Sequence, residues 1–513
     1  MLDEIQKLAL ETIQINKQAL IFLPSRASAE KTAEDLSHLT SLSQPDLEHA
    51  ILKVVSSPTK QCRRLSHCIK KGIAFHHSGL TNDQKDIIET AFREGKIKII
   101  CCTPTLAAGV STPAFRVLIK SLKRFNDRWG QDWIPVLEYL QMVGRAGRPE
   151  FEKFGEAIVI AKNEAEKEEI YEKYICGVPE DIYSKLAAEP TLRTYLLSLI
   201  ASGIIRDNNS MHEFFSKTFW AHQYQDLPKL QTIINKMLTM LKDWEFITLT
   251  NSVSNNSEFT PASKLNQPKE QQMRATLLGK RTSELYLDPL TAKHLLDNLN
   301  NFTNNKKNFS LLQMISHTLE MRPLLRVKAK EQDYIQEQLV KNYDSLLKEE
   351  PSAYDLDYDD FINSIKTALF FSEWIEEKDE DYLLEKYNIR PGEVKVKLDL
   401  AEWLLYASEE LSKIKNNNHA IKEIHKLRLR LQYGVKEELL ALLKLKGIGR
   451  IRARKLYLNN LKDIGDIKTV DLTTLSQILG KALAEDVKQQ VGEDVPKQIS
   501  SKKRLGQMSL GKY

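Results

Sequence analysis

The feature that most constrains the fold of this chain is an alternation of short apolar strands and helices between residues 18 and 161. Helical segments such as "SRASAEKTAEDLSHL" and "TNDQKDIIETAFREG" separate the strand-like runs "QALIFLP", "KGIAFHHSGL", "KIKIICC" and "GEAIVIA". Apolar strands separated by helices predict a parallel sheet that is covered on both faces. Thr81 is a suitable N-cap for the second helix.

Polar residues directly follow three of these predicted strands. Ser25 and Arg26 follow the first strand, His76 and His77 follow the second, and Thr103 to Thr105 follow the third. In open parallel sheets, ligands bind at the carboxyl ends of the strands. These residues are therefore the first candidates for a binding site.

After about residue 163 the strand pattern stops and the chain becomes helical. "IYSKLAAEPTLRTYLLSLIASGII" predicts two helices, and "LQTIINKMLTMLKDWEFITLT" predicts a helix that runs into a short strand pair, an outline typical of a winged helix. The pattern is helical from 285 to about 430, and the last basic helix stops at Gly434. The predicted domains are 1–175, 176–280, 281–432 and 433–495, followed by a basic tail, 496–513, predicted to be disordered.

Composition argues against a membrane or secreted protein. No apolar run approaches the roughly 20 residues that cross a bilayer, and the start, "MLDEIQKLALETIQ", is an amphipathic helix rather than a secretory signal. The five cysteines (Cys62, Cys68, Cys101, Cys102 and Cys176) form no CxxC pair. An odd count without such pairs favours the reduced cytoplasm over a disulfide framework or a zinc site.

The segment "EYLQMVGRAGRPE" places Gln141, Arg145 and Arg148 close together. Two arginines three residues apart share one face of a helix or its adjoining turn, and they can bracket a γ-phosphate. The alternative is a solvated turn whose arginines form surface ion pairs. No GxxxxGK[ST] loop that would hold the phosphates occurs in the chain.

Four segments in order resemble motifs IV, IVa, V and VI of superfamily-two helicases: "ALIFLPSR", "AFHHSGL", "CCTPTLAAGVSTPAF" and "EYLQMVGRAGRP". Over residues 15–470 the chain resembles one branch in particular, the archaeal Hjm-type DNA helicases, which are related to the helicase region of DNA polymerase theta. The later segments "SKLAAEPTLRTYLLSLIASG", "LYLDPLTA" and "AEWLLYASEEL" carry this resemblance as well.

The resemblance implies an α/β RecA-like domain, which is the second motor domain, followed by all-α domains. These are a winged helix, a helical ratchet bundle and a C-terminal helix-hairpin-helix-like domain. The implied activity is ATP-dependent 3′–5′ DNA unwinding at stalled forks. ATP and Mg²⁺ are expected to bind mainly to a first RecA-like domain, on a separate chain or removed from this one, so this chain alone is expected to be inactive.

The resemblance also assigns roles to residues of the motor domain. Gln141, Arg145 and Arg148 are the catalytic candidates, and Thr103, Gly109 and Gly144 are candidates for coupling to the nucleotide. The candidates for contact with single-stranded and forked DNA are Ser25, Arg26, His77 and Thr105.

Gly130 predicts a hairpin turn, and the resemblance implies that this β-hairpin parts the two DNA strands. Trp129, Trp133 or Phe125 would stack on the last base pair, or the tryptophans would instead pack the hairpin onto its own domain.

Trp403 lies on the helix that corresponds to the ratchet helix of the family, where a tryptophan stacks on a base. Its alternative role is core packing beside Leu400, Leu404 and Leu405. The family tends to place an arginine two turns earlier, and this chain has Val396 there. Lys397 or its neighbour Lys395 is the candidate substitute, as a point charge without the planar fork of arginine.

The segment "LLKLKGIGRIRARKLY" predicts a helix, a tight turn and a second helix. Gly447 and Gly449 permit the turn, and Arg450, Arg452 and Arg454 add charge for the DNA backbone. The alternative is a purely structural turn.

The last residues, "RLGQMSLGKY", place Gln507, Leu510 and Tyr513 in a pattern that resembles the peptide which docks on the sliding clamp, PCNA. Two other functions stay open from the sequence. One is a non-enzymatic adaptor that binds single-stranded DNA or the clamp, and the other is a related RNA helicase.

Overall fold

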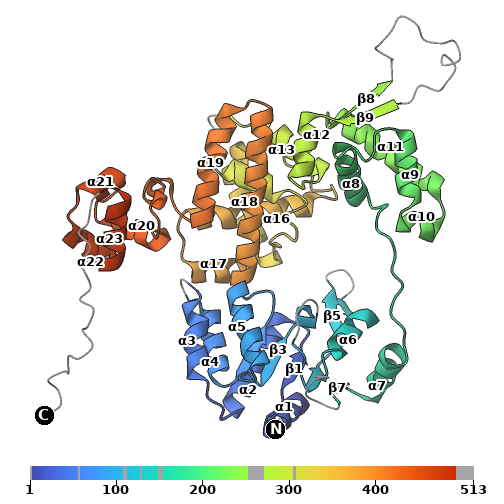
Figure 1. Cartoon of the computed structure of the whole chain (residues 1–513), viewed down its shortest axis with the longest axis vertical. Coiled ribbons are helices and arrows are strands. Elements are labelled where there is room, and N and C mark those ends of the chain that lie inside the picture. The colour runs from blue at the N-terminus through green and yellow to red at the C-terminus, as the bar shows by residue number, and fades with distance from the viewer. Residues whose placement is uncertain are drawn as a thin grey trace, which may run out of the picture.

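The computed structural model describes residues 3–55, 58–107, 112–126, 130–147, 154–251, 271–303 and 308–492. Figure 1 shows an N-terminal α/β domain below a large helical body, with a small helical domain beside that body. An extended segment leads from α7 up to α8 at the far side of the helical body.

The predicted parallel sheet is confirmed. Its five strands are all parallel, in the order β2-β3-β1-β4-β7. Their bounds are β1 (Ala19–Phe22), β2 (Ile73–His76), β3 (Ile99–Cys102), β4 (Arg116–Ile119) and β7 (Glu156–Val159). Every residue of β1 to β4 is buried, as expected for strands whose two faces are covered.

Strand β4 was not among the predicted strands. Its first residue is a charged one, Arg116, which is only 5% exposed. The guanidinium donates to the Glu156 carboxylate (2.6 Å), the Thr12 hydroxyl (3.0 Å) and the Leu8 carbonyl (3.0 Å). These partners satisfy the buried charge, so the strand can begin on an arginine.

Helices surround the sheet and supply the rest of the first core. They are α1 (Glu4–Gln14), α2 (Arg26–Leu39), α3 (Pro45–Lys53), α4 (Lys60–Lys70), α5 (Asn82–Arg93), η1 (Pro104–Ala107), α6 (Val136–Val143), α7 (Glu164–Ile170) and η2 (Tyr171–Ile175). The predicted cap of α5 is confirmed, because the Thr81 hydroxyl accepts from the Gln84 amide at 3.4 Å. Ser25 caps α2 in the same way.

The expected hairpin between β4 and α6 is present. Its strands are β5 (Lys123–Asn126) and β6 (Gly130–Trp133), paired antiparallel. Trp133 packs onto its own domain: its indole N–H donates to Glu169 at 2.7 Å, and its ring lies 5.8 Å from that of Tyr174. Trp129 and the side chain of Phe125 lie outside the described part of the chain.

The first helical unit follows the extended segment. It comprises α8 (Glu189–Ala201), α9 (Asn208–Ser216), α10 (Phe219–Tyr224), α11 (Leu227–Asp243), β8 (Ile247–Asn251), β9 (Gln271–Ala275) and α12 (Leu277–Glu284). The predicted strand pair after α11 is confirmed by the antiparallel pairing of β8 and β9. Residues 182–188 are not helical, so the prediction of two helices in 182–205 was wrong. Pro190 lies in the first turn of the single helix, α8.

The second helical unit is larger. It comprises α13 (Pro289–Asn300), α14 (Asn308–Ser316), η4 (Ala329–Glu331), α15 (Gln332–Asn342), η5 (Tyr343–Ser345), α16 (Tyr358–Ile375), α17 (Glu380–Tyr387), α18 (Pro391–Ile414) and α19 (Asn418–Tyr433). The predicted stop at Gly434 is confirmed by its left-handed backbone, φ +63°. One hydrophobic core runs from Leu192 to Leu431, so the two units are continuous across residue 280.

The C-terminal unit has a separate core of twelve buried side chains between Val435 and Val487. Its elements are η6 (Glu437–Leu439), η7 (Leu442–Lys444), α20 (Arg450–Leu458), α21 (Ile464–Thr469), α22 (Leu472–Leu479) and α23 (Lys481–Gln490). None of the helices in the described ranges is both long and apolar enough to span a bilayer.

Candidate nucleic-acid interface

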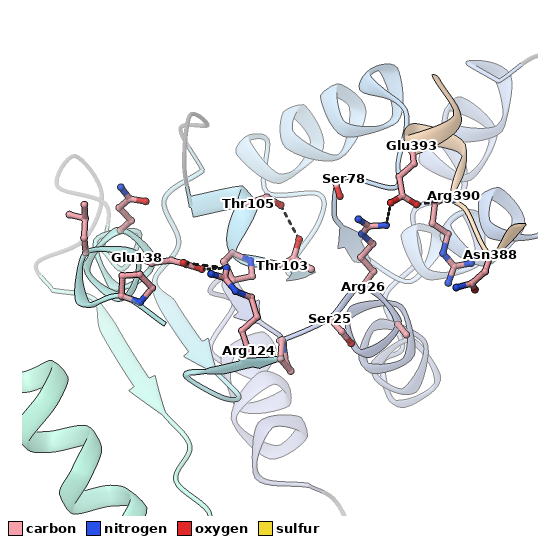
Figure 2. Close-up of a pocket in the computed structure, with 16 residues that line it drawn as sticks. Ser25, Arg26, Ser78, Thr103, Thr105, Arg124, Glu138, Asn388, Arg390 and Glu393 are labelled. Carbon is pink, nitrogen blue, oxygen red and sulfur yellow. Dashed lines mark hydrogen bonds and ion pairs between the residues drawn. The ribbon is translucent and has the colours of Figure 1, made fainter. Parts of the chain in front are cut away.

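An open groove of about 850 Å³ lies at the carboxyl edge of the sheet, between the strand ends, the hairpin and the start of α18. Figure 2 shows its lining residues. They are Pro24, Ser25, Arg26, Ala27, Ser78, Thr103, Pro104, Thr105, Arg124, Pro135, Leu137, Glu138, Gln141, Asn388, Arg390 and Glu393. The structure therefore brings together five of the residues predicted for DNA or nucleotide contact: Ser25, Arg26, Thr103, Thr105 and Gln141.

The two strand ends position these side chains in different ways. After β1, the Ser25 hydroxyl caps α2 by accepting from the Ser28 amide at 3.2 Å, so Arg26 stands in the first turn of a 14-residue helix. After β3, the Thr103 and Thr105 hydroxyls lie 2.9 Å apart across the start of η1. A helix N-terminus beside two hydroxyls is suited to an anionic backbone.

Two of the three arginines that line the groove, Arg26 and Arg124, carry partly exposed carboxylate partners. Arg26 pairs with Glu393 of α18, and Arg124 pairs with Glu138 of α6 at 3.2 Å (Figure 2). All four side chains are at least partly exposed. Exposed ion pairs contribute little net stability, so a phosphate can replace either carboxylate at small cost.

His77 is fully buried and does not reach the groove, which corrects its predicted DNA contact. Its Nδ1 accepts from the Gly79 amide at 3.1 Å, so Nε2 carries the proton and faces Glu30 at 3.2 Å. Burial lowers the pKa of His77 despite the hydrogen bond to Glu30, and the ring is therefore neutral near pH 7. His77 shapes the loop after β2 and lies inside the domain.

Glu30, the partner of His77, is a carboxylate that is only 1% exposed. Burial alone would raise its pKa, but the His77 hydrogen bond and the charges of Arg390 and Arg64 lower that pKa to about 2. Gln61 also donates to it at 2.9 Å, and Arg64 at 2.6 Å. No local sequence pattern indicates this cluster, because its members come from four separate segments.

Arg145 lies in the turn after α6 and is held by η1. Its Nε and Nη2 donate to the Ala107 carbonyl, Nε at 3.1 Å. Among the described residues no carboxylate pairs with Arg145, so its other N–H groups remain available for a phosphate. Gly144 ends α6, and its amide donates to Leu140. Gly109 and Arg148 lie outside the described residues.

Lys397 is only 8% exposed, so its side chain is not free to contact a phosphate, and the predicted contact is corrected. Its ammonium donates to the Pro323 carbonyl at 2.7 Å, and burial lowers its pKa. It therefore ties α18 to a neighbouring loop. Trp403, two turns further along α18, is half-buried, and its indole N–H donates to the Leu285 carbonyl at 3.2 Å.

The three arginines of the C-terminal unit face different surroundings. Arg454 pairs with Glu377 (2.6 Å) and Glu438 (2.7 Å), and Arg450 donates to the Lys378 carbonyl at 2.6 Å. These two therefore dock the unit on the corner between α16 and α17, contrary to their expected place on DNA. Arg452 is exposed and donates to the Gly447 carbonyl at 2.7 Å.

Gly447 and Gly449 form the predicted turn before α20. Gly447 has φ +80°, which favours glycine, and Gly449 caps the helix. The clamp-like residues Gln507, Leu510 and Tyr513 lie outside the described ranges. The described residues contain no cluster of His, Cys, Asp or Glu suited to a metal ion.

Sequence reasoning missed Arg124, Glu138, Asn388, Arg390 and Glu393 as groove residues. The signal for Arg390 and Glu393 was weak but present, since "RPGE" is a helix start with proline in the first turn and glutamate at the third position. Nothing local connects that start to the strand ends more than 280 residues earlier.

Family models match three parts of the chain. The helicase conserved C-terminal domain matches residues 2–150, a helix-turn-helix domain matches 155–248, and domain 4 of archaeal helicases matches 309–434. The parallel sheet, the groove at its edge and these matches define a superfamily-two helicase of the archaeal type.

Similar proteins narrow this class. A protein from Methanococcus vannielii is 35% identical over 94% of this chain, and one from Pyrococcus abyssi is 33% identical over 98%. Both are called ATP-dependent DNA helicase Hel308, and the match covers 67% of each. A Methanocella arvoryzae protein of the same name is 33% identical, with 65% of it covered. The chain belongs to the Hel308 family.

Proposed function

We propose that this chain supplies the second motor domain and the DNA-gripping domains of an ATP-dependent 3′–5′ DNA helicase that acts on forked DNA. The observation that carries the proposal is the groove itself. Residues that follow β1 and β3, residues of α6 and residues at the start of α18 line one open channel, and Arg145 is bonded to Ala107 of η1, the short helix whose Thr105 lines that channel. A translocating motor has to bind a nucleic-acid strand and to respond to ATP. In this proposal the groove binds the strand and Arg145 responds to the nucleotide.

ATP supplies the γ-phosphate whose transfer to water drives the cycle. The phosphate-binding loop and Mg²⁺ belong in this proposal to a first RecA-like domain, since the present sequence contains no such loop. Arg145, with Arg148, meets the triphosphate when the two motor domains close. Gln141, exposed at the groove, lies one turn before Arg145 and orients the same region.

The coupling between nucleotide and DNA runs through η1. Arg145 is held by the carbonyl of Ala107, the last residue of η1, and Thr105 of the same short helix lines the groove. When the Arg145 guanidinium moves toward a phosphate, its hydrogen bond to Ala107 either breaks or moves η1 with it. In both cases the position of Thr105 relative to the DNA strand changes. The half-buried Trp403 of α18 then stacks on a base further along that strand.

The test is reconstitution. The chain is assayed for DNA-stimulated ATP hydrolysis alone and after mixing with a separately produced first RecA-like domain of the family. We expect hydrolysis only in the mixture. Arg145→Ala should lower its rate by about 10³-fold, the order that an arginine finger contributes. Single-strand affinity of the variant should stay within about threefold, because Arg145 lies outside the lining of the groove.

Appreciable hydrolysis by the chain alone contradicts the division of the site. Strand binding that persists while no pairing hydrolyses ATP favours the adaptor function instead. Competition between DNA and RNA strands of the same sequence separates a DNA motor from an RNA motor, and we expect DNA to compete at least as well.

A further inference from the structure

The start of α18 packs directly on the loop that follows β2. The Gly392 amide donates to the Gly79 carbonyl at 2.9 Å. A Cβ atom at Gly392 would lie 2.4 Å from the Leu80 carbonyl oxygen and 2.6 Å from that of Ser78. These separations are far below ordinary contact, so the two backbones meet only because residue 392 has no side chain.

Gly79, on the motor-domain side of the contact, also has no room for a side chain. A Cβ atom there would lie 2.8 Å from the Cβ of Arg390. The loop that carries Gly79 is fixed in turn by His77, whose Nδ1 accepts the Gly79 amide. The contact is therefore a backbone-to-backbone joint between the motor domain and the helical body.

Ion pairs lie on either side of this joint. The Arg390 guanidinium lies 3.6 Å from the buried carboxylate of Glu30, and Glu393 pairs with Arg26 (Figure 2). Glu393 also accepts the Arg390 amide at 3.0 Å, so one carboxylate caps α18 and holds the motor domain. Glu30 is buried but Arg390 is 37% exposed, and Arg26 and Glu393 are both partly exposed, so salt screens each of the two pairs in part.

A second contact lies along α4 and α17. The Lys60 amide donates to Asp381 at 3.2 Å, Arg63 pairs with Asp381 at 3.4 Å, and Lys60 pairs with Glu385. These groups are largely exposed, so the contact adds alignment but little rigidity. The rigid part of the interface is the glycine contact.

We propose that Gly79, Arg390 and Gly392 are positioning residues that transmit motion of the motor domain to α18 and set where Trp403 meets the strand. The inference rests on the proposed function. Trp403 is 12 residues beyond the start of α18, a lever of about 18 Å at 1.5 Å per residue. A tilt of about 10° at the joint moves the indole by about 3 Å, and misplacement of about 1 Å already lowers rates strongly.

Gly392→Ala is the direct test, because the added methyl group must push the backbones apart by about 1 Å to reach ordinary contact. Gly465→Ala, in α21 of the C-terminal unit, is the matched control, since its Cβ meets only the end of the Asp463 side chain. Arg390→Ala is a milder second variant that removes the link to Glu30 without a clash.

The first measurement is the distance between spin labels at Asp86→Cys on α5 and Lys422→Cys on α19, with Cys176→Ser to remove the exposed native thiol. We expect one narrow distance for the parent chain and for Gly465→Ala. Gly392→Ala should shift or broaden it, with a smaller effect for Arg390→Ala. If Gly392→Ala leaves the distance distribution narrow and unchanged, the proposal that this contact sets the position of α18 is refuted, whether or not the parent hydrolyses ATP.

The second measurement is base pairs separated per ATP hydrolysed, in the chain paired with a first RecA-like domain. We expect Gly392→Ala to lower this ratio by about tenfold while DNA-stimulated hydrolysis changes less than about threefold. Hydrolysis and unwinding that fall in parallel contradict a positioning role. A parent pair without hydrolysis refutes the proposed function, and the label distance still decides whether the joint exists.

Discussion

Glu30→Gln is the substitution whose effect on stability follows most directly from the structure. The carboxylate is buried, and His77, Gln61, Arg64 and Arg390 surround it with donors and positive charge. The glutamine keeps the shape but removes the charge. The motor domain should therefore lose the part of its stability that depends on an ionised residue 30.

The magnitude comes from the pKa of Glu30, which is about 2 in the folded protein against an ordinary value of 4.5 for a glutamate side chain. A lowered carboxyl pKa means that the ionised form stabilises the fold above the unfolded pKa. Its contribution at pH 7 is about 3 kcal/mol. It decreases as the pH falls from about 5 toward 2, and at pH 3 less than half remains.

The assay is thermal and urea unfolding of the motor-domain transition at pH 7 and at pH 3. We expect Glu30→Gln to lower the melting temperature by about 10 °C at pH 7, and the difference from the parent to shrink by more than half at pH 3. Glu34→Gln, which removes a more exposed partner of Arg64, is the control and should cost less than about 1 kcal/mol. A parent and variant that differ equally at both pH values would refute the reasoning.

Three further substitutions test individual contacts. Trp403→Ala should weaken single-strand binding by about 1–3 kcal/mol in a fluorescence-anisotropy titration, with Trp403→Phe in between; equal affinities for all three contradict stacking. Lys397→Met should lower the melting temperature, because the Pro323 carbonyl loses its donor at a cost of about 1–3 kcal/mol. The affinity of this variant for single-stranded DNA should stay within about twofold of the parent. A large loss of affinity would instead support the predicted contact between Lys397 and DNA. Trp133→Ala should destabilise the hairpin and its contact with Glu169, which increased protease cleavage near residue 130 would report; unchanged cleavage argues against packing.

The strands of the motor domain could be predicted because burial on both faces makes each of them a short apolar run. β4 could not, because Arg116 stands in it and the partners that satisfy this charge come from α1 and β7. The helix expected over 182–188 failed for a related reason. Gln223 holds that backbone extended by accepting from the Ser184 amide (2.9 Å) and donating to the Ile182 carbonyl (2.8 Å).

The groove was predictable on its motor side and not on the other. Ser25, Arg26, Thr103 and Thr105 were found because parallel strands place their carboxyl ends at one edge. Arg390 and Glu393 were missed because the contact of α18 with the sheet is set by tertiary packing between distant segments.

Lys397 shows how a charged residue can mislead a prediction. Val394, Lys397, Ala401 and Leu404 follow the three- and four-residue spacing of a buried helical face, and all four are buried. The position therefore belongs to the inner side of α18, whereas Val396 beside it is 58% exposed. A lysine next to Val396, where the resembled family tends to have an arginine, suggested a phosphate contact, whereas the helical period places Lys397 on the buried face.

The measurement that tests the central claim most directly is strand separation by this chain paired with a first RecA-like domain. The substrates are two duplexes of identical sequence, one with a 3′ single-stranded tail and one with a 5′ tail. The account predicts ATP-dependent unwinding of the 3′-tailed duplex, little of the 5′-tailed one, and loss of unwinding with Arg145→Ala. Unwinding that survives Arg145→Ala, or that favours the 5′ tail, would contradict it.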